Sequence, residues 1–194
     1  MRLNIFVGFL VLALFCLVPL PSQATVVMKL SEEDMANQAG TIVTGTVTSV
    51  KSEWNEERTK IFTYITITPS NFLKGDQPAQ EIVIVQPGGE VGDIGMLVDG
   101  TPVFEEGEEV LLFLNRGRKG FHRTVGLSQG EFSIQSDPIT QRKVLLKKRP
   151  RLIRDSSGKI KRQTITIKSN KKLYLDDFEK KIKDILQRKN EAKQ

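Results

Sequence analysis

Cysteine and histidine are nearly absent from this chain of 194 residues, which contains one of each, Cys16 and His122. An intrachain disulfide needs two cysteines, and a structural zinc site needs four ligands that are mostly cysteine or histidine. The sequence therefore excludes both as staples of the fold. Histidine-assisted nucleophilic catalysis would depend on His122 alone, which we interpret as a surface-loop histidine. We expect no catalytic residue, no metal site and no cofactor.

The first residues have the pattern of a cleavable signal peptide. Arg2 supplies a basic start, residues 5–18 form an apolar run broken by one glycine, and small side chains occupy positions 22 and 24. We expect cleavage after Ala24, which removes residues 1–24. The exported protein would then begin at Thr25 and reside in the periplasm or the extracellular medium.

Two other interpretations of this segment exist. The uncharged stretch of residues 3–28 is long enough for a transmembrane anchor, but its proline-rich end and the cleavage pattern favour removal. A lipoprotein would carry its lipid on Cys16, but the bulky Leu14 and Phe15 precede it where small residues are typical. Removal of the segment takes the only cysteine with it. About 170 residues then remain, enough for one domain with a sizeable hydrophobic core.

Charge is divided unevenly along the rest of the chain. Residues 25–138 contain nine basic and 17 acidic residues, a net charge of −8, whereas residues 139–194 contain 19 basic and six acidic residues, a net charge of +13. This asymmetry bears on the choice of partner, because each part attracts molecules of opposite charge and the two parts also attract each other.

Strand patterns dominate the acidic part. Ser31 precedes three acidic residues, which resembles a capping box and predicts a short helix to about Ala39. Alternating or continuous apolar runs separated by glycine and proline then predict strands. These strands lie at residues 41–50, 61–68, 81–86, 110–114, 123–127 and 131–134, of which the last two are either separate strands or one bent strand.

The basic part is expected to mix strand, loop and helix. Residues 143–146 form a strand that pairs back on residues 132–134, residues 147–162 form an exposed basic loop, and residues 164–168 alternate like a strand. From about Tyr174, apolar residues at three- and four-residue spacing predict an amphipathic helix. Its apolar face consists of Leu175, Phe178, Ile182, Ile185 and Leu186.

These patterns predict a mainly β protein, an OB-like small barrel with a short N-terminal helix and a C-terminal amphipathic helix. Residues 25–138 are expected to form the barrel domain. Residues 139–194 are expected to form a basic C-terminal extension with hairpin strands and the terminal helix.

A series of short motifs recurs in one order between residues 30 and 134. It includes Leu73-Lys74-Gly75, Gly88-Gly89, Gly100-Thr101-Pro102, Phe104, Gly107-Glu108 and Leu111-Leu112-Phe113-Leu114. The series resembles a family of uncharacterised exported bacterial proteins, and more remotely it is similar to the netrin-like and metalloproteinase-inhibitor OB barrels. The resemblance implies an OB barrel and, as an alternative function, a partner or inhibitor of an exported protease. Those inhibitors bind the protease zinc through an N-terminal cysteine, which a chain beginning at Thr25 lacks.

Trp54, the only tryptophan, is the first candidate binding residue. It lies between the first two predicted strands, beside Glu53, Glu56 and Glu57. In OB barrels the loop after the first strand borders the ligand face, so an aromatic side chain there is suited to anchor a ligand. The alternative is that Trp54 caps one end of the barrel.

The second candidate is the basic segment of residues 147–162. Its named binding residues are Lys147, Lys148, Arg149, Arg151 and Arg154. They would meet phosphates, anionic lipid or polyanionic glycans, or else remain solvated on a loop. Nucleic acid is not expected as a partner, because the basic part lacks aromatic stacking residues outside its helix and the protein is exported.

Two further clusters are interpreted as structural. The glycines of residues 88–92 lack the Lys-Ser/Thr of a phosphate-binding loop and are expected to supply positive φ angles, as are Gly100 and Gly107. Glu105, Glu106, Glu108 and Glu109 are expected to form a solvated turn whose repulsion the basic part relieves.

The sequence thus favours an exported, non-enzymatic binding protein of the bacterial cell envelope. Its expected partner is a protein or a polyanionic envelope component, with peripheral contact to anionic membrane as a further option. A hydrolase with an unrecognised carboxylate site is the least favoured class.

Overall fold

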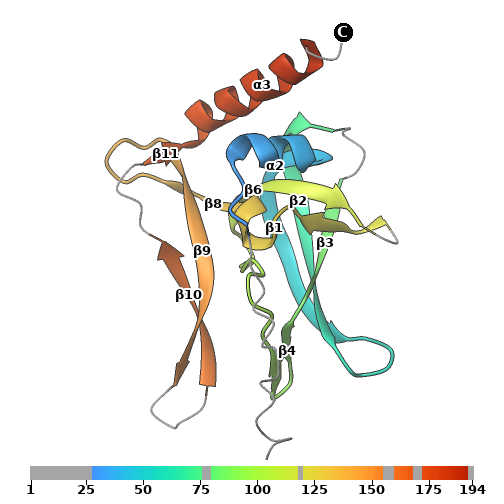
Figure 1. Ribbon diagram of the computed structural model, residues 1–194. Helices are drawn as coiled ribbons and strands as arrows, with labels where there is room; N and C mark the ends of the chain where they lie inside the picture. The colour runs from blue at the N-terminus through green and yellow to red at the C-terminus, as the bar shows by residue number, and fades with distance from the viewer. Residues whose placement is uncertain (1–27, 76–79, 118–119, 155–159, 168–171, 192–194) are drawn as a thin grey trace, which may run out of the picture.

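Five strands close into a small barrel in the computed structural model, which describes residues 28–75, 80–117, 120–154, 160–167 and 172–191, of which 151–154 and 160–162 by backbone alone. The barrel strands are β1 (Thr41–Trp54), β2 (Ile61–Lys74), β3 (Ile82–Pro87), β6 (Glu109–Arg116) and β7 (His122–Thr124). They pair in the order β1-β2-β3-β7-β6, and β6 closes the ring on β1, with β3 and β7 parallel. The predicted OB-like barrel is confirmed (Figure 1).

The long strand β1 takes part in both edges of the closure. It pairs with β2 over its whole length and with β6 through residues 41–46. Such double pairing requires a strongly coiled strand, and register shifts mark the bend on either side of Gly45. A side chain at Gly45 would place a Cβ 2.5 Å from the Thr68 carbonyl oxygen. The close approach of β1 and β2 at this bend therefore requires glycine.

Strand β6 is buried on both faces, as its continuous apolar run predicts. Leu111 and Phe113 lie in one hydrophobic cluster, and Val110, Leu112 and Leu114 lie in a second one inside the barrel. β2 shows the alternation of a half-buried strand, with Ile61, Ile65 and Ile67 fully buried. The barrel interior therefore forms from the period-two pattern that the sequence displays.

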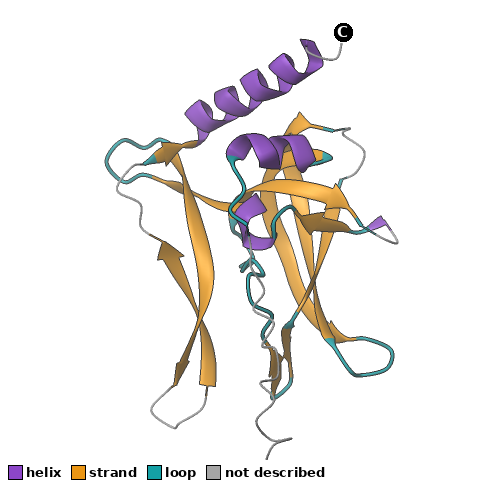
Figure 2. Cartoon of the chain, in the orientation of Figure 1, coloured by secondary structure: helices purple, strands orange, loops and turns teal. Residues whose placement is uncertain are grey.

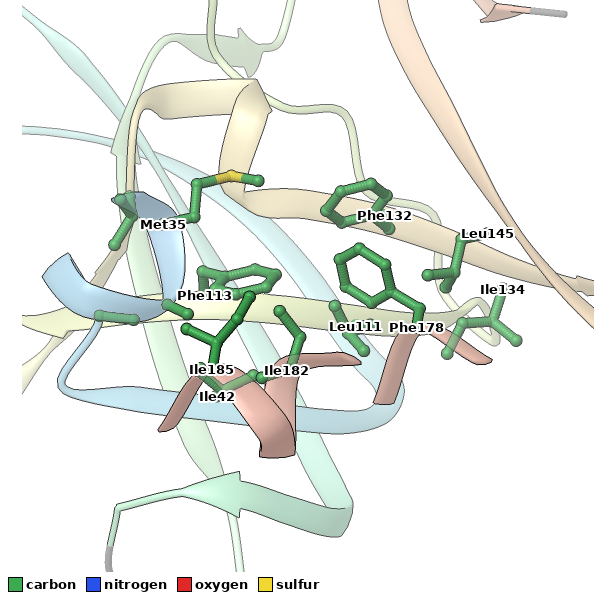
Figure 3. Packing of buried hydrophobic residues seen from close by; sticks show 13 residues of the cluster. Met35, Ile42, Leu111, Phe113, Phe132, Ile134, Leu145, Phe178, Ile182 and Ile185 are labelled. Carbon is green, nitrogen blue, oxygen red and sulfur yellow. The ribbon is translucent and has the colours of Figure 1, made fainter. Parts of the chain in front are cut away.

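Two helices cover one side of the barrel. In α2 (Glu32–Gln38), Ser31 and Asp34 complete the predicted capping box, with the Asp34 amide 3.0 Å from Ser31 Oγ. α3 (Leu175–Glu191) buries Phe178, Ile182 and Ile185 against the barrel. Figure 3 shows Phe178 reaching Phe113 and Phe132, with ring centroids 6.2 and 5.3 Å away. The predicted apolar helix face is confirmed.

The remaining strands extend the sheet beyond the barrel. β8 (Glu131–Ser136) pairs with β6 and with β9 (Lys143–Arg154), and β9 also pairs with β10 (Ile160–Ile167) and β11 (Leu173–Tyr174). A short 3₁₀ helix, η2 (Leu127–Gly130), precedes β8. β4 (Gly89–Val91) and β5 (Ile94–Met96) form a small separate hairpin that the sequence patterns did not predict.

The prediction of an exposed loop over residues 147–162 is wrong. Residues 147–154 of β9 pair with residues 160–167, so this stretch is a two-stranded hairpin, and residues 155–159 at its turn lie outside the described residues. We call residues 147–154 together with β10 the arm. Figures 1 and 2 show the arm standing apart from the barrel, with only its base joined to the rest of the sheet.

Within the described residues, no helix is long and apolar enough to cross a membrane. The expected signal peptide, residues 1–24, lies outside the described part of the chain.

Candidate functional site

A groove of about 590 Å³ lies on the outer face of the barrel, and Trp54 is one of the residues that line it. Its walls come from the β1–β2 turn, the outer faces of β2 and β3, and the residues that flank the β6–β7 connection. The lining consists of Glu53, Trp54, Asn55, Glu56, Glu57, Phe62, Tyr64, Val85, Gly117, Phe121 and Arg123. In OB folds, the face of strands 2 and 3 between these two loops is the usual ligand surface. We call this surface the aromatic groove.

The β1–β2 turn that forms one wall is fixed by Asn55. Its Oδ1 accepts hydrogen bonds from the backbone amides of Thr59 and Lys60, both at 2.8 Å. The backbone N–H of Asn55 donates to the Lys60 carbonyl. Asparagine commonly organises turns in this way, because its short side chain substitutes for a backbone carbonyl. The turn holds Glu56 and Glu57 at the rim of the groove, where both side chains are exposed.

Aromatic side chains form the floor. Phe62 and Tyr64 lie two residues apart on β2 and therefore point to the same, outer face of the sheet. Tyr64 meets Phe121 edge to face, with ring centroids 5.7 Å apart. Trp54 is half-buried and lines the same groove together with Phe62, Tyr64 and Phe121.

The carboxylates of the aromatic groove form no ion pair within the described part of the chain. Among the described residues, no salt bridge involves Glu53, Glu56 or Glu57. The Trp54 and Tyr64 side chains likewise take part in none of the hydrogen bonds found in the described part of the chain. Three carboxylates face a single lining cation, Arg123. The groove therefore presents aromatic faces and net negative charge to a ligand.

Two of the basic candidate residues, Lys147 and Lys148, are held by internal contacts. Lys148 is buried, and its Nζ lies 2.6 Å from Glu108 Oε1 and 3.8 Å from Glu105 Oε1. Lys147 Nζ donates to the carbonyls of Ser128 at 3.2 Å and Gln129 at 2.5 Å, and also to that of Glu131. These two lysines stabilise the protein from within and do not belong to an exposed basic surface.

Arg149, Arg151 and Arg154 lie beyond these lysines on the arm. Arg149 is exposed, and no ion pair involves it among the described residues. Arg151 and Arg154 occupy β9 opposite Gln163 and Ile160, and their side chains lie outside the described part of the structure. Their role in binding stays a prediction.

The acidic turn before β6 is only partly solvated. Glu108 is nearly buried beside Lys148, and Glu109 pairs with Lys143 at 2.6 Å. Glu106 Oε1 accepts a hydrogen bond from the Val50 amide at 2.9 Å. The expected relief of repulsion by the basic part is therefore confirmed, whereas the description of the whole turn as solvated is wrong for Glu108.

A buried carboxyl, Glu131, lies behind this ion pair. Its side chain is 0 % exposed, and neither carboxyl oxygen has a hydrogen-bond partner in the described residues. Burial raises the pKa of Glu131 to about 8, because the attraction of nearby Lys147 does not offset the loss of water. The group is enclosed and does not line the aromatic groove.

A second, larger hollow of about 820 Å³ lies at the base of the arm, bordered by α2, η2 and α3. Several of its cations are already occupied. Lys147 and Lys148 have the partners described above, and Lys181 forms an ion pair with Glu32. This hollow therefore offers less free charge to an anionic ligand than its count of basic residues indicates.

His122, the only histidine of the chain, occupies a strand. It lies on β7 and is half-buried, so its interpretation as a surface-loop residue is wrong. Burial lowers the pKa of the imidazole, and Nδ1 is buried without a hydrogen-bond partner in the described part of the chain. No group of three or more potential metal-binding side chains occurs among the described residues.

Residues 126–130, Gly-Leu-Ser-Gln-Gly, have the Gly-x-Ser-x-Gly spacing of serine hydrolases. A nucleophile elbow joins a strand to a helix and places the serine at the strained position. Strand β7 and a turn do precede η2 here, but Ser128 lies within this 3₁₀ helix, and the positive φ angles belong to Gly126 and Leu127. The Ser128 amide donates to the Gly100 carbonyl at 2.9 Å. The segment is a structural turn.

The glycines expected to need positive φ do adopt it. Gly88, Gly89, Gly92, Gly100 and Gly107 have φ between 60° and 134°. The interpretation of residues 88–92 as a loop of conformational glycines is confirmed, with the addition that Gly89 begins strand β4.

No protein-family model matches this chain, and neither a curated protein nor a solved structure shows significant similarity to it.

Proposed function

We propose that this chain is an exported, non-enzymatic binding protein whose ligand occupies the aromatic groove. The observation that carries the proposal is the joint lining of one groove by four aromatic side chains and three carboxylates, which form no ion pair with any described residue. Its volume of about 590 Å³ lies within the range of ordinary ligand sites. Export follows from the signal-peptide pattern of residues 1–24.

The chemistry of the groove favours a cationic ligand. A guanidinium or ammonium group over an aromatic ring is attracted by the ring quadrupole, and carboxylates at the rim add charge-assisted hydrogen bonds. A polyanion would meet the carboxylates of Glu53, Glu56 and Glu57 and be repelled. The aromatic groove thus favours a different class of partner from the polyanions that the basic segment indicated. Nothing in the described residues favours a protease inhibitor over this proposal.

Trp54 provides a direct measurement, because it is the only tryptophan of the chain and lines the groove. The chain from Thr25, which keeps every described residue, should change its tryptophan fluorescence saturably when an arginine-rich peptide is added. Heparin, a polyanion, should leave the fluorescence unchanged. The double variant Glu56→Lys/Glu57→Lys should weaken peptide binding about tenfold or more.

The matched control is Glu33→Lys/Asp93→Lys, which makes the same charge change at exposed positions outside the groove. It should bind the peptide like the wild type. Equal peptide binding by both double variants would show that the groove is not the site. Fluorescence that responds to heparin and not to the peptide would contradict the assignment of a cationic ligand.

A further inference from the structure

We infer that the aromatic groove receives the basic arm of a second copy of this chain, so that copies assemble head to tail. The inference rests on the proposed function, since it names the occupant of the same groove. It also unites Trp54 with the arginines of the basic segment as the two halves of one interface.

Charge complementarity is the first argument. The groove is lined by Glu53, Glu56 and Glu57 against the single cation Arg123. The strands of the arm contain five basic residues beyond the two internally held lysines and no acidic residue. These are Arg149, Arg151, Arg154, Lys161 and Arg162. The chain thus carries a cationic element whose chemistry fits its own groove.

The type of cation is the second argument. Arginines predominate on the outer part of β9, at positions 149, 151 and 154. A planar guanidinium stacks on aromatic rings and binds carboxylates through two parallel hydrogen bonds, whereas an ammonium acts as a point charge. Tyr64 and Trp54 line the groove with aromatic rings. Their polar side-chain atoms also form no hydrogen bond with any described residue. The floor and rim of the groove therefore match arginine better than lysine.

The placement of the arm is the third argument. Residues 147–154 pair with β10 alone, while the pairings of β9 with β8 and β11 use residues 143–146. In Figure 1 the arm lies on the side of the barrel opposite to the β1–β2 turn, which is a wall of the groove. The arm of one chain therefore does not fill its own groove.

This geometry decides the kind of assembly. A contact between two different surfaces is heterologous. Repeated from copy to copy, it generates a ring if the rotation closes and an open chain if it does not. Direct strand pairing between two arms is disfavoured, because their free edges carry many basic residues and Pro150. Side chains of the arm, and not its backbone edges, would make the contact.

Sedimentation velocity on the chain from Thr25 tests the inference. At low ionic strength the average mass should rise with protein concentration, and it should return to that of a monomer in about 0.5 M salt, where the Debye length is only a few ångströms. The groove variant Glu56→Lys/Glu57→Lys and the arm variant Arg149→Glu/Arg151→Glu should each remain monomeric. The control Lys180→Glu/Lys183→Glu, on the exposed side of α3, should assemble like the wild type.

A mixture of complementary variants gives the decisive result. The arm variant made with Trp54→Ala excludes any groove contact, so it should stay monomeric with every partner. A chain with an intact groove and a defective arm, mixed with a chain with a defective groove and an intact arm, should instead form dimers that do not grow. This follows because each dimer retains no second functional pair of surfaces. Wild-type chains that stay monomeric, or groove and arm variants that assemble like wild type, overturn the inference.

The arginine peptide separates this failure from failure of the proposed function. A monomeric wild-type chain whose Trp54 fluorescence still responds to the peptide overturns self-assembly and leaves the groove as a binding site for another cationic partner. A monomeric chain whose fluorescence does not respond overturns both.

Discussion

Lys148 Nζ lies 2.6 Å from Glu108 Oε1, and the two side chains are only 6 % and 8 % exposed. This pair joins the basic strand β9 to the acidic turn before β6, across 40 residues of sequence. Removing one partner of a buried ion pair leaves the other charge uncompensated in a medium that solvates it poorly. The contact therefore couples the basic C-terminal part to the barrel.

Lys148→Met should lower the free energy of unfolding by about 3–5 kcal/mol, because Glu108 then remains buried without its partner. Urea denaturation followed by circular dichroism measures this loss. The double variant Glu108→Leu/Lys148→Met should recover most of it, since a buried pair can be replaced by apolar side chains at little cost.

Lys143→Met is the matched control for Lys148→Met. It breaks the ion pair with Glu109, whose partners are 48 % and 33 % exposed, and should cost about 0–1 kcal/mol. Equal losses in the two single variants would contradict the special role of the buried pair.

The elements that bury one face or a continuous apolar run were predicted from the sequence. The period of β2, the apolar run of β6 and the apolar face of α3 are all local patterns, and each appears where it was expected. The capping box at Ser31 is equally local. Burial dictates these patterns, so they can be recognised without a structure.

The strands of residues 147–162 and the full lining of the groove were not predicted, because no local burial pattern specifies them. Residues 147–162 have no apolar alternation that would reveal their strands, although residues 164–168 do alternate and were expected to form a strand, and β4 is too short for a period. Trp54 was a candidate binding residue with a barrel-end cap as the alternative, whereas Phe62 and Tyr64 were not candidates at all. Their convergence with Phe121 depends on the pairing of β2, β3 and β7, which no local pattern specifies.

Phe178→Ala should lower the free energy of unfolding by about 3–5 kcal/mol. Phe178 is 1 % exposed and contacts both Phe113 and Phe132, so its removal leaves a cavity between α3 and the barrel. Thermal and urea unfolding measure the effect. Phe178→Leu, which keeps most of the apolar volume, should lose clearly less. An unchanged midpoint for Phe178→Ala would show that α3 does not complete the core.

Gly89→Ala should destabilise the protein by about 3 kcal/mol or more. Its φ of +134° disfavours a side chain, and a Cβ there would lie 2.3 Å from Ser52 Oγ and 2.4 Å from Thr63 Oγ1. Gly107→Ala is the control, because Gly107 also has a positive φ, +82°, but no atom lies within 4 Å of its Cβ position. It should lose only about 1–2 kcal/mol from backbone strain. Comparable losses in both variants would place the cause in φ alone and not in the close contact.

Glu131 should make the protein less stable as the pH rises from about 4.5 to about 8. Its ordinary pKa is 4.5, and burial raises it to about 8 in the folded protein. In this window the folded state keeps a proton that the unfolded state has released. Stability therefore falls with increasing pH, by up to about 1.4 kcal/mol per pH unit from this group. Lys147, Lys148 and Glu108 are the charged groups that act on it.

Glu131→Gln isolates this contribution, because glutamine resembles the protonated carboxyl and does not titrate. Urea unfolding of the variant and the wild type between pH 4 and 9 should show a difference in unfolding free energy that grows in favour of the variant and levels off once Glu131 is ionised in both states. Ser133→Ala, a buried non-titrating neighbour on β8, should give a difference that does not depend on pH. A flat difference curve for Glu131→Gln would mean that this carboxyl is ionised in the folded protein at neutral pH, and that Lys147 compensates its charge.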